Sequence, residues 1–221
     1  MKKLALIITL FTAIGTNAFA QDGYVDFFAS HLRVWDEFTS PGTGVVAPGD
    51  VNVTFLWALV GTPDPLGAVV PITGVSSMAG GWNTVSSMIS SGWNIAVDDG
   101  TGAEADVADT ANGIQKGEID YNNDLSFALA GSTGGDTYEI VVIGWDNQTG
   151  ATTLGDGMAG DLAMGWSNEF EYTTGTTNTS PISNFTDGMN AFGVAPVPEP
   201  ATFALAGLGG LAMLLLRRRN K

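Results

Sequence analysis

Hydrophobic and polar residues alternate with a period of two along much of the chain, which is the pattern of half-buried β-strands. The alternation is clean over residues 51–55 and runs into an apolar stretch that ends at residue 60, which predicts a buried strand. Residues 137–145 are rich in β-branched side chains and predict the strongest strand. Shorter stretches with strand character predict further strands at residues 23–28, 93–97, 125–130, 169–174 and 191–194.

Clusters of Gly, Asn, Asp and Pro separate these stretches, as turns separate short antiparallel strands. Residues 84–90 and 154–164 predict short helices instead, and glycines weaken the second of these predictions. Many short strands joined by such turns predict an all-β fold. We expect an antiparallel β-sandwich of jelly-roll or Ig-like type, with a partly open barrel as the alternative.

The beginning of the chain departs from the strand pattern. Lys2 and Lys3 precede a short apolar run, and Ala18 and Ala20 then form an A-x-A sequence. A positive start, a short apolar segment and an A-x-A end are the parts of a secretory signal peptide. We therefore predict that residues 1–20 direct Sec-type export and are cleaved off after Ala20.

The end of the chain carries an uncharged, largely apolar segment, residues 201–216, followed by three arginines. As a helix this segment is about 24 Å long, against about 30 Å for the hydrocarbon core of a bilayer. It spans a membrane only marginally, with help from bilayer thinning or arginine snorkelling. Arg217, Arg218 and Arg219 then act as stop-transfer charges on the cytoplasmic side. We predict a single transmembrane helix here.

Two prolines stand directly before this segment, in the sequence Val197-Pro198-Glu199-Pro200. Proline ends helices and strands and keeps its neighbours extended, which is the backbone form that a protease or transpeptidase grips. The order of motif, apolar helix and arginine-rich tail resembles the PEP-CTERM sorting signal of Gram-negative bacteria that make exopolysaccharide. The resemblance covers about the last 25 residues.

The resemblance implies an enzyme partner and a destination. In that family an exosortase, a membrane-embedded cysteine transpeptidase, cuts at the motif, which here is Val197, Pro198, Glu199 and Pro200. It implies a precursor that is anchored in the inner membrane. It also implies a product on the outer surface or in the extracellular matrix, in the setting of exopolysaccharide and biofilm.

These signals divide the chain into four parts. We predict a signal peptide at 1–20, an acidic β-sandwich ectodomain at 21–174, a Thr/Ser/Asn-rich terminal strand and spacer at 175–196, and the sorting signal at 197–221.

Charge is distributed unevenly among these parts. The 221-residue chain has a formal charge of -15, but six of its eight basic residues lie in the two terminal signals. Residues 21–197 hold 22 acidic against two basic groups, a formal charge of -20. Such a domain repels phosphate backbones and anionic lipid surfaces, which argues against nucleic acid as a partner. The absence of cysteine excludes disulfides, thiolate catalysis and cysteine-bound zinc.

Tryptophan follows glycine at four places, and an asparagine or aspartate comes one or two residues later at each. One interpretation is that each ring packs in the core while the indole N–H and the polar neighbour belong to a turn. The alternative is a carbohydrate-binding module in which exposed rings of Trp82, Trp93 and Trp166 contact glycan faces.

Few residues are candidates for catalysis or metal binding. His31 is the only histidine, and no G-x-S-x-G sequence accompanies it, so we expect no catalytic triad. The acidic stretch 98–106 offers oxygen ligands for Ca²⁺, but its spacing fits no EF-hand and a solvated acidic turn is the simpler interpretation. Paired carboxylates leave a secreted glycan hydrolase as a further alternative. We predict a non-enzymatic protein without a cofactor.

Overall fold

A computed structural model describes most of the ectodomain. The described residues are 21–30, 33–36, 51–64, 81–108, 117–121, 125–147, 150–178 and 183–195. The predicted signal peptide, His31 and the whole predicted sorting signal lie outside them. Within these ranges strands dominate and helices are short, so the prediction of a mainly β fold is confirmed.

Strands and helices follow one another in an order close to the one that the sequence predicts. The elements are β1 (Gly23–Val25), β2 (Phe28–Ala29), β3 (Val34–Asp36), β4 (Val51–Leu59), α1 (Trp82–Ser90), β5 (Asn94–Ile95), β6 (Val97–Asp98), β7 (Ala103–Glu104), β8 (Val107–Ala108), β9 (Ile119–Asp120), β10 (Phe127–Leu129), β11 (Thr137–Asp146), α2 (Leu154–Ala159), β12 (Met164–Trp166), β13 (Phe170–Thr173), the 3-10 helix η2 (Phe185–Asp187) and β14 (Phe192–Val194).

The long strands β4 and β11 form the centre of the fold. They pair antiparallel along their whole length, from Leu59 opposite Tyr138 to Val51 opposite Asp146. β12 and β13 continue this central sheet beyond β11, and β5 and β8 continue it beyond β4. The two strands are those that the sequence predicts most strongly, because long runs of β-branched and aromatic side chains fit a pleated, buried surface.

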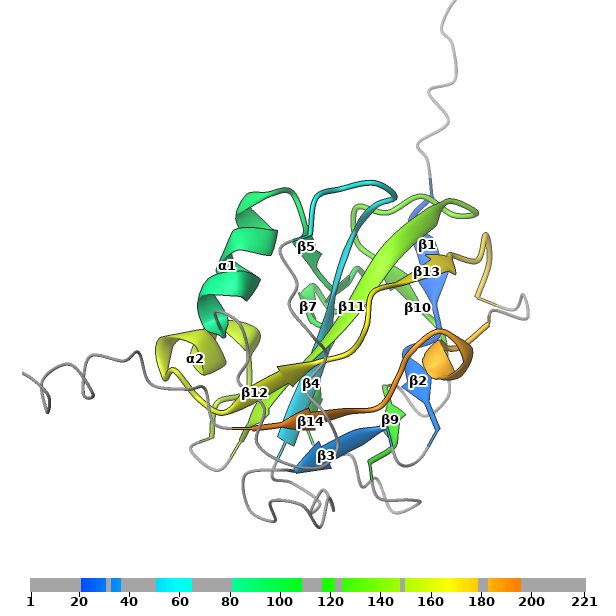
Figure 1. Cartoon of the computed structure of the whole chain (residues 1–221). Coiled ribbons are helices and arrows are strands. Elements are labelled where there is room, and N and C mark those ends of the chain that lie inside the picture. Colours follow the sequence, from blue (N-terminus) through cyan, green and yellow to red (C-terminus); the bar gives the residue numbers. More distant parts are fainter. Residues whose placement is uncertain are drawn as a thin grey trace, which may run out of the picture.

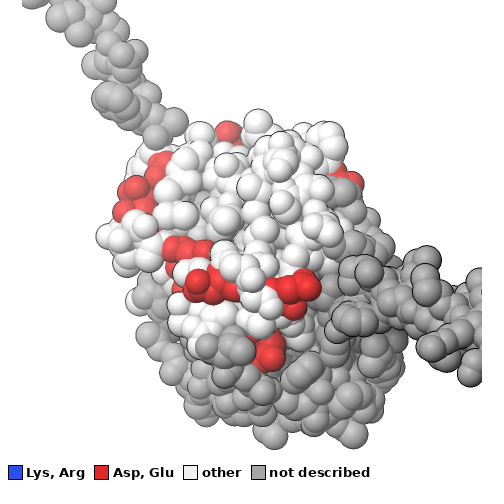
Figure 2. All heavy atoms as spheres, turned by 90° about the vertical axis from the view of Figure 1, so that its left-hand side faces the viewer, with Lys and Arg blue, Asp and Glu red and all other residues white. Residues whose placement is uncertain are grey.

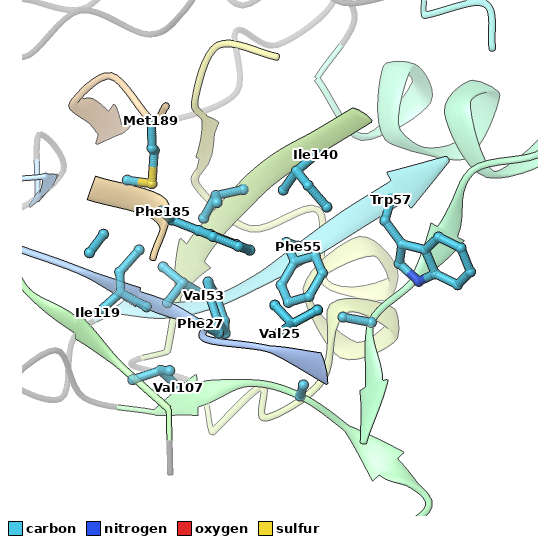
Figure 3. Packing of buried hydrophobic residues seen from close by; sticks show 14 of the residues in the cluster. Val25, Phe27, Val53, Phe55, Trp57, Val107, Ile119, Ile140, Phe185 and Met189 are labelled. Carbon is cyan, nitrogen blue, oxygen red and sulfur yellow. The ribbon is translucent and has the colours of Figure 1, made fainter. Parts of the chain in front are cut away.

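Side chains of the central sheet point alternately to two hydrophobic clusters, as the period of two requires. Phe55 and Ile140 belong to the larger cluster, in which Phe27 and Phe185 also pack (Figure 3). Leu56 and Val141 point to the opposite face of the sheet and belong to the smaller cluster. Both faces of the sheet are therefore buried.

Different elements cover the two faces. The larger cluster contains residues of a four-stranded sheet with the order β1-β10-β6-β7 and of the two-stranded pairs β2-β9 and β14-β3. Helices α1 and α2 lie together on the other side of β4 and β11 (Figure 1) and contribute residues to the smaller cluster. The helices that the sequence predicts thus form a layer on one face.

The predicted helix 154–164 is too long at its C-terminal end. α2 ends at Ala159, and a turn through Gly160 and Asp161 leads into β12 at Met164. Asp161 has a positive φ of 48°, which a continuing helix does not allow. A six-residue helix therefore replaces the predicted eleven-residue one.

Residues on both sides of the boundary predicted at Thr174 pack into the same fold, and the predicted terminal strand and spacer contains β14. Thr174 is buried and donates a hydrogen bond to the carbonyl of Thr133, and Gly175 exchanges backbone hydrogen bonds with Tyr24. Farther along, Phe185 and Phe192 are fully buried. The described part of the predicted spacer thus belongs to the core of the ectodomain.

Candidate functional site

The junction between the ectodomain and the predicted sorting signal is short. Ala195 is fully buried and pairs with Met164, with its N–H donating at 3.1 Å and its carbonyl accepting at 3.0 Å. Val197, the first residue of the predicted motif, follows two positions later in the sequence. The described part of the chain therefore extends to within two residues of the motif.

Close backbone contact holds this last segment in place. β14 pairs in parallel with β3, so that the end of the ectodomain lies beside one of its first strands. A side chain at Gly165 in β12 would collide with the carbonyl oxygen of Gly193 in β14. Glycine at position 165 is needed for this approach, and β14 is therefore an integral part of the fold.

The three tryptophans that the sequence offers as possible glycan contacts are not on the surface. Trp82, Trp93 and Trp166 are only 6%, 2% and 0% exposed. Their rings belong to the smaller cluster between the central sheet and the helices. They cannot offer their faces to a glycan in this fold. The predicted glycan contacts at these three residues are therefore wrong.

The interpretation that the Gly-Trp rings pack in the core, with their N–H groups in turns, agrees with the hydrogen bonds of three of the four tryptophans, while the buried Nε1 of Trp166 has no partner. The indole N–H of Trp82 donates to the carbonyl of Leu162 at 2.8 Å, and that of Trp93 donates to the carbonyl of Pro63 at 3.1 Å. Trp145 donates in the same way to Ala151 at 2.9 Å. These three rings lie in the core, and their N–H groups bind backbone carbonyls outside the regular strands.

A cavity that sequence analysis missed opens at one end of the central sheet. Its volume is about 310 Å³, and the turns that follow α1 and β10 contribute to its wall. Trp57 and Tyr138 supply aromatic rings 5.0 Å apart in an edge-to-face arrangement. Further polar side chains that line it are those of Thr62, Asn94, Thr133 and Asp136. Only the β4–β11 register brings Trp57 near Tyr138, and no sequence motif signals that pairing.

The acidic stretch 98–106 forms a hairpin of β6 and β7. The carboxylate of Asp98 accepts hydrogen bonds from the Gly100 N–H at 2.9 Å and from the Tyr121 hydroxyl at 3.0 Å. Among the residues that the structure describes, no group of three or more acidic or histidine side chains is arranged to hold a metal ion. The carboxylate of Asp98 thus stabilises the turn between β6 and β7.

Glu104, in the same hairpin, has an unusual protonation equilibrium. Burial raises its pKa to about 7, and the neighbouring carboxylates of Asp106 and Asp156 act in the same direction. The Leu154 N–H, which donates to Glu104 at 2.9 Å, opposes the shift. Near neutral pH this carboxyl group is therefore about half protonated.

We expect Glu104 to make the domain more stable in mild acid. The pKa in the folded state is raised above the ordinary value of 4.5, so the folded state binds more protons than the unfolded state between pH 4.5 and about 7. The free energy of unfolding should therefore rise as pH falls through this window. Glu104→Gln should be more stable than the parent at pH 8, by about 1 kcal/mol after allowance for solvent screening.

Urea unfolding of both proteins at pH 4.5 and pH 8 measures this difference. Asp99→Asn removes one negative charge from an exposed position and serves as the control for general charge repulsion. An equal gain in both variants at pH 8 would contradict a specific effect of Glu104.

The charged side chains visible on the face that carries the helices are acidic. Figure 2 shows several of them there and no basic side chain among the described residues. Arg33, a described basic residue, donates hydrogen bonds from its guanidinium to the carbonyls of Met189 and Thr186. The Arg33 side chain therefore stabilises the segment around η2. Within the part of the chain that the structure describes, no basic surface for binding anions is present.

No helix within the described ranges is long and apolar enough to cross a membrane. The predicted transmembrane segment, with Arg217, Arg218 and Arg219, lies outside these ranges and stays a prediction. The same holds for the predicted signal peptidase site at Ala18 and Ala20.

Comparison with protein families identifies the C-terminal segment. Residues 196–219 match the family model of the PEP-CTERM protein-sorting motif. The resemblance seen in the sequence is thus confirmed, and the match begins directly after Ala195. No curated protein and no solved structure matches the chain.

Proposed function

We propose that this chain is the precursor of a non-enzymatic protein of the outer surface or extracellular matrix, delivered there by exosortase-dependent sorting. The PEP-CTERM motif at residues 196–219 carries this proposal, because it indicates an exported precursor that an exosortase processes. The predicted signal peptide at 1–20 supplies the export step. Association with exopolysaccharide is the role that we propose for the delivered ectodomain.

The short junction constrains how processing occurs. A fully extended chain covers at most about 3.6 Å per residue, so Pro198 lies within about 11 Å of Ala195. We infer that the exosortase acts directly beside the folded ectodomain, because Ala195 is fixed in the fold by its two hydrogen bonds to Met164. The cut then leaves a product with only a few residues beyond β14.

The ectodomain itself is suited to a matrix component. We infer a β-sandwich in which the central sheet faces the smaller sheets, with Phe27 and Phe55 4.8 Å apart between them, while α1 and α2 cover the outer face of the central sheet. The excess of carboxylates keeps such a domain soluble and separates it from anionic surfaces. These properties favour a secreted binding or structural role over catalysis.

Deletion of the exosortase in the producing bacterium tests the proposal. We expect the full precursor to accumulate in the inner-membrane fraction and the protein to disappear from the surface and matrix fractions. Immunoblots of the fractions, with an exported protein that lacks the motif as the control, measure this. An unchanged amount in the matrix fraction would contradict exosortase-dependent sorting.

A further inference from the structure

Gln21 is the first residue that the structure describes, and it stands directly after the predicted cleavage point at Ala20. Export as proposed above therefore leaves Gln21 at the amino terminus of the delivered protein, with a free α-amino group. The side-chain amide carbon of a glutamine can be reached by its own α-nitrogen, because the reaction closes a five-membered ring. Such an intramolecular attack needs no second reactant and has a large effective concentration.

The fold holds the backbone of Gln21 at an atom that takes no part in this reaction. The carbonyl oxygen of Gln21 accepts a hydrogen bond from the Gly134 N–H at 3.0 Å. β1 begins two residues later, where the Gly23 N–H donates to the Ser132 hydroxyl at 2.9 Å. The new ring consists of the α-nitrogen, Cα, Cβ, Cγ and Cδ, so the backbone carbonyl lies outside it. The cyclised residue therefore keeps its hydrogen bond to Gly134.

The side-chain amide of Gln21 is free to move to the α-nitrogen. Gln21 is exposed, and its Nε2 donates to the Tyr24 hydroxyl at 3.3 Å, which is longer than the usual range of about 2.7–3.2 Å. An exposed hydrogen bond of this kind is exchanged for one to water at little cost. The α-amino group is a nucleophile only when it is unprotonated, and near neutral pH part of an ordinary amino terminus is in that form.

Protection of this end of the chain preserves the fold. β1 pairs with β10 over its whole length, and both Val25 and Phe27 are fully buried. Only Gln21 and Asp22 precede β1 in the delivered protein. An aminopeptidase outside the cell would reach β1 after two cuts. A lactam at residue 21 has no free α-amino group for such an enzyme to bind, so it stops trimming at the first residue.

We propose that Gln21 is a modification site and that the delivered protein begins with pyroglutamate at this position. In this step the α-nitrogen of Gln21 forms a bond to Cδ and the Cδ–Nε2 bond breaks. Nε2 leaves as ammonia and takes up a proton from the α-amino group, while the side-chain carbonyl stays in the ring as a lactam. The step needs no oxidant, reductant or cofactor. The proposal rests on the signal peptide of the proposed function, but it does not depend on the exosortase.

Mass spectrometry of the amino-terminal peptide tests the modification. The protein is taken from the producing bacterium, whichever fraction holds it, and its free amino groups are dimethylated at harvest. Cyclisation during later handling is thereby excluded. Trypsin then releases residues 21–33, because Arg33 is the first lysine or arginine after the cleavage point. We expect this peptide to carry no dimethyl label and to be lighter than the encoded sequence by the mass of one ammonia molecule.

Gln21→Asn is the matched control, because its shorter amide would have to close a strained four-membered ring. This variant should be dimethylated at residue 21 and lose that residue to an added aminopeptidase, whereas the parent should keep it. A dimethylated Gln21 in the parent overturns the proposal, and so does a blocked amino terminus that the variant shares. A peptide that begins at another residue also overturns it, and places the failure in the predicted export signal. Residues 21–33 do not include the sorting motif, so these outcomes are independent of the exosortase.

Discussion

Replacement of Pro198, Glu199 and Pro200 by alanine should leave the protein in the membrane as an uncut precursor. Alanine is the strongest helix former, so we expect the predicted transmembrane helix to extend upstream into the motif, and the extended backbone that the prolines are predicted to favour would be lost. A loss of about 1.4 kcal/mol in recognition already lowers the rate tenfold, and we expect the exported form to fall by about that factor or more.

Immunoblots of membrane and matrix fractions measure this result. The matched control replaces Arg217, Arg218 and Arg219 by lysine, which keeps the stop-transfer charge and should leave processing intact. Normal export of the alanine variant in a shortened form would show that the motif is not the recognition element.

Phe185→Ala should destabilise the ectodomain by about 3–5 kcal/mol, the usual cost of removing a buried phenylalanine ring. The ring is fully buried and lies 5.3, 5.2, 5.2 and 5.0 Å from those of Phe27, Phe55, Phe170 and Tyr172. A loss of this size is a large part of the about 5–15 kcal/mol that holds a typical domain together.

Urea unfolding of the exported protein measures this loss. Leu125→Ala, at a side chain that is 61% exposed, is the control and should change the stability by less than about 0.5 kcal/mol. A similarly small effect of Phe185→Ala would mean that the segment around η2 is a peripheral spacer and not part of the core.

The prediction of the fold from sequence succeeds where strands are long. Residues 51–60 and 137–145 have enough β-branched and aromatic positions to show their period, and they became β4 and β11. Two-residue strands such as β7 and β9 contain no period to read. The parallel pairing of β3 with β14 joins segments more than 150 residues apart, and local patterns carry no signal for it.

The placement of the tryptophan side chains could not be predicted from local sequence patterns either. Gly81 and Gly92 have positive φ values of 49° and 106°, so the chain turns sharply before Trp82 and Trp93. The sequence predicts the turn but not the side to which the ring then points, and both rings are buried. Trp57 and Tyr138 looked like ordinary strand residues, and only their register and the turns around them create the cavity. The sorting motif needed no such context, because its recognition depends on a contiguous sequence.

Intact-mass measurement of the exported protein tests exosortase-dependent sorting most directly. The producing bacterium must have an active exosortase, and the protein is collected from its surface or matrix fraction. We predict a mass that corresponds to a chain without residues 1–20 and cut within or next to residues 197–200, so that the arginine-rich tail is missing. A mass that still includes residues 217–221 would contradict sorting by cleavage at the motif.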